Sequence, residues 1–350
     1  MTLRPAAFAI PGDINTLTGG YIYERHLLAG LRAQGRDVAH IELGSSFPNP
    51  TQGDMEDAEM RLTAVDPDRP VILDGLVFGS IDTGLLNRMA APIVAMIHHP
   101  LAHESGLDAA WRDHLYRTER DNLSHAAHVL VPSPHTAALL SSDYGVSSDR
   151  ITIARPGTVQ PNVQTAPTDP PLILSVGIQH PRKGHDILLR ALALLADRDW
   201  QAVIVGGRYD TAHAAELEQL HAQLGLAGRV RFAGRVDEGA LAWLYGQAAI
   251  FALATRYEGY GIVFDEAMAH GLPIVSCQTG AVPDTVAEGA GMLVEPESPE
   301  AFADALGELL VDRGLRAQMA TAAGRAGAAL PGWGHAAQVA GVVLDQILSE

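Results

Sequence analysis

Short apolar runs alternate along the whole chain with longer stretches in which apolar residues recur at helical spacing. A run of four to six apolar residues is typical of a strand buried on both faces, and strands separated by helices predict parallel βαβ units. In the first half we expect strands at Ala6–Ile10, Asp37–Leu43, Val71–Asp74, Ile93–Ile97, His128–Val131 and Ile151–Ala154. The helix-like stretches between them are Tyr21–Ala33, Leu107–Ser124 and Pro134–Ser141.

The alternation is interrupted at Thr158–Pro171, where Pro161, Pro167, Pro170 and Pro171 rule out a continuous helix and predict a linker. It then resumes. Strands are expected at Leu172–Val176, Ala202–Val205, Val230–Phe232, Ile250–Leu253, Pro273–Ser276 and Gly291–Val294. Helices are expected at His185–Ala196, Ala212–Leu224, Gly239–Gln247, Val263–His270, Pro299–Val311, Leu315–Ala328 and His335–Leu348.

A chain of 350 residues exceeds what one core usually organises, so this pattern predicts an α/β protein of two Rossmann-like parallel-sheet domains facing across a cleft. We place the N-terminal domain at 1–165 and the C-terminal domain at 166–332. Ligands of open α/β sheets bind outside the carboxyl ends of the strands, so the expected cleft is the expected site.

Composition narrows the function classes. The chain has 24 Lys and Arg against 41 Asp and Glu, a net charge of −17, which argues against nucleic acid as the main partner. The single cysteine, Cys277, permits no internal disulfide and fits a reducing compartment. No apolar stretch is long enough for a transmembrane segment, and Met1–Ile10 is typical of a first strand rather than a signal peptide. We expect a cytoplasmic protein.

The segment with the most chemical information runs from Glu258 to Glu266, two acids separated by seven residues. Gly259 and Gly261 flank Tyr260 just before a predicted helix. Glycines there let backbone N–H groups approach an anion, and the helix N-terminus favours negative charge, as a diphosphate requires. Glu266, about one turn inside the helix, can accept the hydroxyls of a ribose. A surface helix with two ordinary acids is the alternative.

A second segment, Ser175 to Gly184, follows a predicted strand and opens a helix. Its adjacent cations, Arg182 and Lys183, can neutralise a leaving diphosphate through charge-assisted hydrogen bonds. A solvated basic turn is the alternative.

These segments resemble the retaining glycosyltransferases of family 4, which have the GT-B fold and a Glu-x7-Glu signature that Glu258 and Glu266 match. The resemblance extends over nearly the whole chain and is densest from Leu172 to Pro296. It implies that Lys183 is the lysine that contacts the diphosphate. Where many members have an arginine this chain has Ile178, so Arg182 is the candidate for the second cation.

The resemblance adds donor-side residues. It implies that Gly259, Tyr260, Gly261 and Ile262 line the donor site, and that the loop from Thr279 to Asp284 places the backbone of Gly280 near the phosphates. Ala281 and Asp284 stand where the family usually has glycine and glutamate. At Gly234–Asp237 it implies backbone contacts from Val236 to the nucleobase, although Asp237 also fits a simple helix cap.

The remaining resemblance lies near the chain ends. Gly19 and Gly20, between the first strand and the first helix, resemble the family's glycine loop beside the diphosphate and acceptor. They form no Gly-x-Gly-x-x-Gly fingerprint, so a nicotinamide site is not supported. His98 matches a histidine that approaches the transferred sugar. A final helix with Trp333, within 333–350, is expected to pack back on the N-terminal domain.

Metal binding is the alternative for the segment around His98, where His99, His103 and Glu104 also offer ligands. No second ligand cluster with recognisable spacing appears, so we expect neither a metal nor a cofactor. Asp66-Pro-Asp68 resembles the metal-binding pair of the other glycosyltransferase architecture, but lies in a predicted turn. His103, Glu104 and the predicted loop Ser45–Asp54 are candidates for acceptor specificity.

Together these features predict a metal-independent retaining hexosyltransferase of carbohydrate biosynthesis that uses a front-face mechanism. It would move a sugar from a nucleoside-diphosphate sugar to an unidentified acceptor: a sugar, a small molecule or a lipid-linked glycan. Lys183, Arg182, Glu258 and His98 are the candidate catalytic residues. The alternatives are a nucleotide-sugar epimerase or a phosphorylase on the same scaffold, and a non-catalytic nucleotide-sugar-binding protein.

Overall fold

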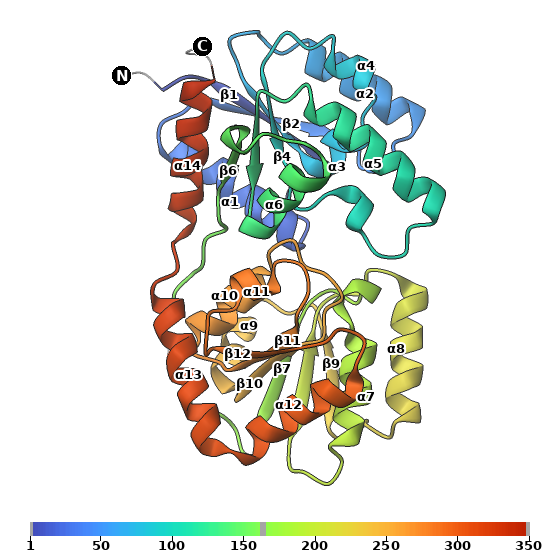
Figure 1. Cartoon of the computed structure of the whole chain (residues 1–350), viewed down its shortest axis with the longest axis vertical. Helices are drawn as coiled ribbons and strands as arrows, with labels where there is room; N and C mark the ends of the chain where they lie inside the picture. The colour runs from blue at the N-terminus through green and yellow to red at the C-terminus, as the bar shows by residue number, and fades with distance from the viewer. Residues whose placement is uncertain (1–2, 162–165, 348–350) are drawn as a thin grey trace. The chain divides into compact units, whose positions relative to one another are not determined.

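A computed structural model describes residues 3–161 and 166–347. The chain divides into two compact units (Figure 1), of which the first comprises Met1–Gly157 and Pro331–Glu350 and the second Thr158–Leu330. The division falls at the start of the proline-rich stretch, between Gly157 and Thr158, whereas the sequence pattern predicts it after residue 165. None of the described residues between 158 and 171 lies in a helix or strand, as the proline pattern predicts.

The first unit contains a six-stranded parallel sheet in the order β2-β1-β3-β4-β5-β6. Its strands are β1 (Ala6–Pro11), β2 (Val38–Leu43), β3 (Val71–Asp74), β4 (Ile93–Met96), β5 (His128–Val131) and β6 (Ile151–Ile153). Its helices are α1 (Gly19–Ala33), α2 (Gln52–Thr63), α3 (Gly75–Phe78), α4 (Thr83–Leu86), α5 (Ala109–Leu123), α6 (Pro134–Asp143) and α14 (Trp333–Gln346), with short 3₁₀ turns at Leu101–His103 and Ser148–Arg150.

The second unit repeats this architecture in the order β12-β11-β10-β7-β8-β9, again all parallel. Its strands are β7 (Leu172–Val176), β8 (Gln201–Val205), β9 (Val230–Gly234), β10 (Ile250–Leu253), β11 (Ile274–Cys277) and β12 (Gly291–Val294). Its helices are α7 (His185–Leu194), α8 (Thr211–Gln223), α9 (Glu238–Gln247), α10 (Ile262–Ala269), α11 (Val282–Thr285), α12 (Pro299–Val311) and α13 (Arg313–Ala328), and Pro181–Lys183 forms a 3₁₀ turn.

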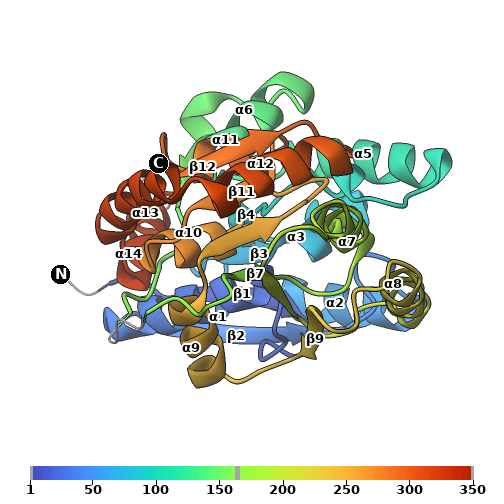
Figure 2. The same ribbon diagram turned by 90° about the horizontal axis from the view of Figure 1, so that it is seen from below.

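Both faces of the second sheet are covered by helices. Along β7, Ile173 packs in one apolar cluster with residues of α7 and α12, whereas its neighbours Leu172 and Leu174 pack in another with residues of α9 and α10. Figure 2 shows these two pairs of helices on opposite sides of the strands. Because successive side chains of a strand point to opposite faces, this alternation explains why the strand sequences are continuously apolar. The fold class expected from the sequence, an α/β protein with two Rossmann-like parallel-sheet domains, is confirmed.

Several elements differ from the expectation. Helices α2, α3, α4 and α11 were not predicted, and α2 includes residues 52–54, so the expected loop at Ser45–Asp54 ends at Thr51. The hydroxyl of Thr51 accepts a hydrogen bond from the Asp54 N–H at 3.1 Å. This cap stabilises a helix whose first turn contains Gly53 and therefore resembles a turn in the sequence.

The C-terminal helix α14 belongs to the first unit and packs against α1. The indole of Trp333 stacks on the His26 ring at a centroid distance of 4.2 Å and tilts against Tyr23 at 6.0 Å. The segment that ends the first part of this unit packs closely against the start of α14, since a Cβ on Gly157 would lie 2.1 Å from the backbone nitrogen of Trp333. The last segment of the chain is therefore part of the core of the unit that the first segment builds.

Candidate functional site

The strand order of each sheet reverses at one point, and most of the candidate residues lie on the loops that begin there. In the second unit the reversal lies between β7 and β10, so the loops that follow these strands diverge to opposite sides. In the first unit it lies between β1 and β3. Ligands of open α/β sheets bind at such switch points, at the carboxyl ends of the strands. This argument from topology selects the loops after β7, β10, β1 and β3.

After β7, the chain forms the 3₁₀ turn Pro181–Lys183 and enters α7 through Gly184. Gly184 has φ of +61°, and a Cβ there would lie 1.8 Å from the carbonyl oxygen of Ala254, just after β10. Only glycine combines this conformation with so close an approach. The two loops are thereby held together, and Lys183 lies beside the loop after β10.

Lys183 and Glu258 form an ion pair in which the ammonium Nζ lies 2.7 Å from Oε1. Their side chains are only 13% and 5% exposed. Arg182 extends the pair, with its Nη1 3.6 Å from the other oxygen of Glu258. The two segments singled out separately in the sequence therefore meet in one buried cluster of two cations and one anion.

The Glu258 carboxyl is ionised within this cluster. Burial raises its pKa, but the neighbouring ammonium and guanidinium, and hydrogen bonds from Lys183 and Thr255, together bring the pKa below its usual value. The Thr255 hydroxyl donates to Oε1 at 3.0 Å. Since the cluster contains two cations and one anion, it keeps a net positive charge and can attract a further anionic group.

Arg256 holds the two loops in place, and the sequence analysis did not identify it. Its guanidinium forms two hydrogen bonds with Asp186 of α7, at 2.9 and 3.0 Å, and also contacts Glu297. Its backbone N–H donates to the Arg182 carbonyl at 2.8 Å. Bidentate pairing of this kind fixes orientation. The signal in the sequence that could have indicated such a pairing is Asp186, an acid in the first turn of the helix that follows Lys183.

The glycine-rich segment before α10 packs against the loop that follows β11. The Ala281 N–H donates to the Glu258 carbonyl at 2.8 Å, and a Cβ on Gly280 would lie 2.4 Å from that oxygen. Tyr260 is buried, with its hydroxyl bonded to Asp265 and its carbonyl accepting from Thr285. Gly280 and the Tyr260 side chain are thus placed to shape the loop that carries Glu258.

Gly259 is buried beside Tyr260. Gly261, with φ of +92°, is the N-cap of α10, and Ile262 is its first residue. At the end of β9, Val236 is partly buried against the α9 and α10 cluster. The carboxylate of Asp237 caps α9 by accepting from the Ala240 N–H at 2.7 Å, as the alternative interpretation of that segment stated.

Glu266 lies one turn inside α10, where the hydroxyl of Tyr245 donates to its Oε2 at 2.7 Å. Burial raises the pKa of Glu266 to about 7, although the Tyr245 hydrogen bond opposes the shift. The Tyr245 ring in turn stacks on His270, with centroids 5.1 Å apart. Tyr245 was not predicted, because its position in α9 indicates only an apolar helix face.

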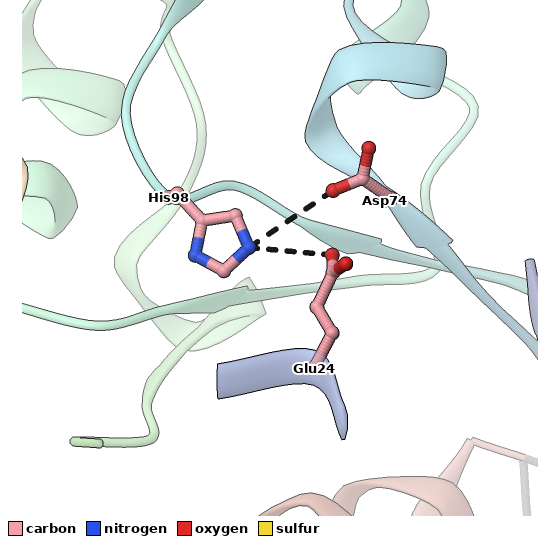
Figure 3. A group of neighbouring side chains, drawn as sticks. All are labelled: Glu24, Asp74 and His98. Carbon is pink, nitrogen blue, oxygen red and sulfur yellow. Dashed lines mark hydrogen bonds and ion pairs between the residues drawn. The ribbon is translucent and has the colours of Figure 1, made fainter. Parts of the chain in front are cut away.

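In the first unit His98 meets two buried acids that the sequence did not suggest (Figure 3). Its Nε2 lies 3.3 Å from Oε1 of Glu24, on α1, and 3.9 Å from Oδ2 of Asp74, at the end of β3. Gly19 and Gly20 form the first turn of α1 rather than a loop before it. A Cβ on Gly20 would lie 3.6 Å from the His98 ring, so the two predicted features are neighbours.

The side chains that the metal alternative combined, His98, His99, His103 and Glu104, do not form a converging group within the described residues. His99 pairs with Glu104, Nε2 to Oε2 at 3.3 Å. Within the described residues, the group whose ligand atoms converge is Glu24, Asp74 and His98. Asp66 and Asp68 lie in a turn closed by a hydrogen bond from the Asp68 N–H to the Asp66 carboxylate, as predicted.

Comparison with protein families identifies what the second unit is similar to. Residues 158–325 match the family model described as glycosyl transferases group 1. The second unit, Thr158–Leu330, therefore resembles this glycosyltransferase family over nearly its whole length. The match includes the ion-paired cluster around Glu258 and the Glu266–Tyr245 pair, and it ends before α14.

Curated relatives include the D-inositol 3-phosphate glycosyltransferases of Xylanimonas cellulosilytica and Corynebacterium diphtheriae. The first is 37% identical over 213 residues, covering 55% of this chain and 51% of that protein. The second is 30% identical over 242 residues, covering 63% and 57%. The matched region thus spans about half the length of these relatives.

Solved structures show that the two-unit fold is shared. The sucrose-phosphate synthase of Thermosynechococcus elongatus superposes with a TM-score of 0.83 at 23% identity, covering 99% of each chain. Anabaena Alr3699/HepE, solved in complex with UDP and glucose, gives 0.78 at 16% identity, covering 98% of this chain and 100% of that one. At such identities the likeness concerns the fold. In the described parts of this chain no helix has the length and apolar character to cross a membrane.

Proposed function

We propose that the protein is a retaining glycosyltransferase that moves a hexose from a nucleoside-diphosphate sugar to an acceptor hydroxyl. The observation that carries the proposal is the buried cluster of Lys183, Arg182 and Glu258 at the switch point of a glycosyl transferases group 1 unit. A diphosphate needs cations at the point where charge develops as it leaves, and such preorganised groups lower the barrier most.

The cluster supports distinct roles for its members. Lys183 and Arg182 would share their hydrogen bonds between Glu258 and the diphosphate oxygens. Glu258, held by Thr255 and by the backbone contact with Ala281, would orient the sugar. With two side-chain cations in place, we propose that the leaving group needs no divalent ion. The acceptor proton would pass to the departing phosphate oxygen, in a front-face reaction without a covalent intermediate.

Glu266 is suited to the ribose of the donor. The Tyr245 hydroxyl occupies one of its carboxylate oxygens, so the other can accept a ribose hydroxyl. Val236 and Gly280 would contribute backbone contacts to the base and phosphates, next to the glycine-rich start of α10. A uridine nucleotide is the first donor to test, because HepE was solved with UDP-glucose.

The first unit would contribute His98, beside Gly20, to the transferred sugar. For the acceptor, the names of the curated relatives direct the first test to D-inositol 3-phosphate. A panel of free sugars, sugar phosphates and lipid-linked glycans completes the comparison.

The decisive experiment measures nucleoside diphosphate release with and without acceptor, and analyses the anomeric configuration of the product by NMR. Transfer with retention that depends on acceptor and persists in excess chelator is the expected result. Conversion of the donor without acceptor would establish an epimerase, and a requirement for free phosphate a phosphorylase. Donor binding without turnover across the panel would leave only a binding protein. An inverted product would refute the retaining mechanism.

A further inference from the structure

The cluster around His98 is built from three separate elements of the first unit. Glu24 comes from α1, Asp74 from the carboxyl end of β3, and His98 from the loop after β4. The Glu24 and Asp74 side chains are 2% and 3% exposed, whereas that of His98 is 22% exposed. The histidine is therefore the part of the cluster that a ligand can reach.

The two carboxyls can share one proton. Oxygens of the two buried carboxyls lie within 4.8 Å of each other. Two ionised carboxylates at this separation would repel each other, so one of them is expected to stay protonated. Burial raises the pKa of Glu24 to about 7, and burial together with the Glu24 charge raises that of Asp74 well above its usual value. Asp74 is oriented independently, because its Oδ1 accepts the Leu76 N–H at 2.9 Å.

The imidazole is oriented by this pair. Nε2 faces both acids, and Figure 3 shows the other ring nitrogen, Nδ1, directed away from them. A neutral imidazole has one donor and one acceptor nitrogen, and a carboxylate beside Nε2 selects the form with the proton on Nε2. The lone pair of Nδ1 then points away from the two acids (Figure 3). Gly20 lies on the opposite side of the ring from Nδ1, since a Cβ there would be 3.6 Å from Cδ2 and Nε2.

We propose that Glu24 and Asp74 are positioning residues that lock His98 in the Nε2–H form, so that its Nδ1 accepts a hydrogen bond from a hydroxyl of the carbohydrate substrate. This role rests on the proposed function for its consequence in the reaction. The locked form itself is a property of the unliganded protein. The two can therefore fail separately.

The other groups around the cluster make contacts of their own within the described part of the chain. From α1, the Tyr23 ring meets His98 edge-on at 5.5 Å, and its hydroxyl donates to the Ala154 carbonyl at 2.7 Å. His26 stacks on Trp333 of α14. From α6, the Thr136 hydroxyl reaches the His98 carbonyl at 3.4 Å. Among the described residues, Glu24 and Asp74 are the acids whose oxygens lie within 4 Å of Nε2.

The first experiment reads the ring directly by NMR of protein labelled with ¹⁵N-histidine, at pH 7. Of the 15 histidines, His98 is assigned as the one whose signal disappears in His98→Ala. Wild type is expected to show a neutral ring protonated at Nε2. In the E24Q/D74N double variant neither partner carries a charge, and the amide NH₂ at position 74, whose oxygen still caps Leu76, replaces the Oδ2 that lies 3.9 Å from Nε2. The proton is then expected to move to Nδ1.

The second experiment is a double-mutant cycle on transfer. We expect E24Q/D74N to lower kcat/KM roughly tenfold, the size of one hydrogen bond, and to produce no further loss in the His98→Ala background. Glu119→Gln is the matched control, because it removes another fully buried carboxyl of the same unit that does not contact His98. Its His98 signal should match wild type.

Three results would overturn the proposal. One is a wild-type ring protonated at Nδ1, or doubly protonated, at pH 7. Another is an equal loss of activity on E24Q/D74N with and without His98, which would show a merely structural role. The third is a divalent ion that copurifies at one per chain and binds Nε2, which would make the cluster a metal site. If wild type transfers no sugar at all, the proposed function fails while the NMR result still decides the locked form.

Discussion

The Lys183–Glu258 pair allows effects on stability and on activity to be separated. A second substitution is expected to restore the stability that the first one removes, but not the activity. Lys183→Met keeps the length of the side chain but leaves the Glu258 carboxylate 5% exposed without its nearest cation. Removing one partner of a buried pair costs about 3–5 kcal/mol. Arg182, at 3.6 Å, compensates in part, so we expect a loss near the lower end, about 3 kcal/mol.

Adding Glu258→Gln to Lys183→Met removes the carboxylate that lost its nearest cation, and leaves Arg182, 16% exposed, with its hydrogen bond to the Tyr257 carbonyl. The double variant should recover most of the lost stability, since replacing both members of a buried pair is often nearly neutral. Activity should not recover. Loss of one charge-stabilising group typically lowers kcat by about 10²–10³-fold, and the double variant also lacks the carboxylate that we propose to orient the sugar.

Urea denaturation followed by circular dichroism measures the stability, and release of nucleoside diphosphate in the presence of acceptor measures the activity. Arg190→Gln, which removes the 45% exposed partner of Asp186, is the control for loss of an ion pair in the same unit and should change stability by less than about 1 kcal/mol. Turnover of Lys183→Met within twofold of wild type would refute the leaving-group role. A double variant as unstable as the single one would refute the account of the buried charge.

Three further predictions follow from individual contacts. Burial raises the pKa of Glu119 to about 8, so the folded chain binds this proton more tightly than the unfolded chain does, and stability falls as pH rises from about 4.5 to 8. Glu119→Gln should therefore unfold at a higher urea concentration than wild type at pH 8, and an equal midpoint would contradict this. Tyr245→Phe removes the hydrogen bond that lowers the pKa of Glu266, so the pH at which the nucleoside diphosphate binds half-maximally, by calorimetry, should move upward from about 7; an unchanged profile would exclude Glu266 from binding. Gly184→Ala combines a left-handed residue with a contact at 1.8 Å, and should destabilise the chain by more than about 1 kcal/mol in the same urea assay, whereas Gly225→Ala, left-handed but in open space, should cost less.

The sequence was informative where a local pattern decides the outcome. Continuous apolar runs located the strands because the residues of a parallel strand are buried on both faces. Boundaries shifted by one or two residues, as at β1, which extends to Pro11, and at α10, which begins at Ile262. The short helices α3 and α4 escaped notice because four residues carry no helical period, and the caps Asp74 and Asp82 resemble ordinary acids of turns.

The contacts within the candidate site were less accessible to sequence reasoning. Lys183 and Glu258 are 75 residues apart, and nothing local indicates that they pair. Tyr245 and Glu24 sit in helices whose pattern predicts burial but not a polar partner. Such pairs depend on strand order, because the order decides which loops are neighbours. A sequence that predicts every strand still leaves that order open.

Strand order also explains why the two units present similar clusters without similar residues. In each sheet the loops at the reversal diverge and leave backbone ends exposed to a ligand. In the second unit, Glu258 is kept ionised by two cations, so the cluster is positive and suits an anion. In the first unit, the paired acids Glu24 and Asp74 hold a proton and orient a neutral imidazole, which suits a hydroxyl. Under the proposed function, the second unit would supply charge stabilisation and the first unit neutral hydrogen bonding, which is the division that transfer from a charged donor to an uncharged hydroxyl requires.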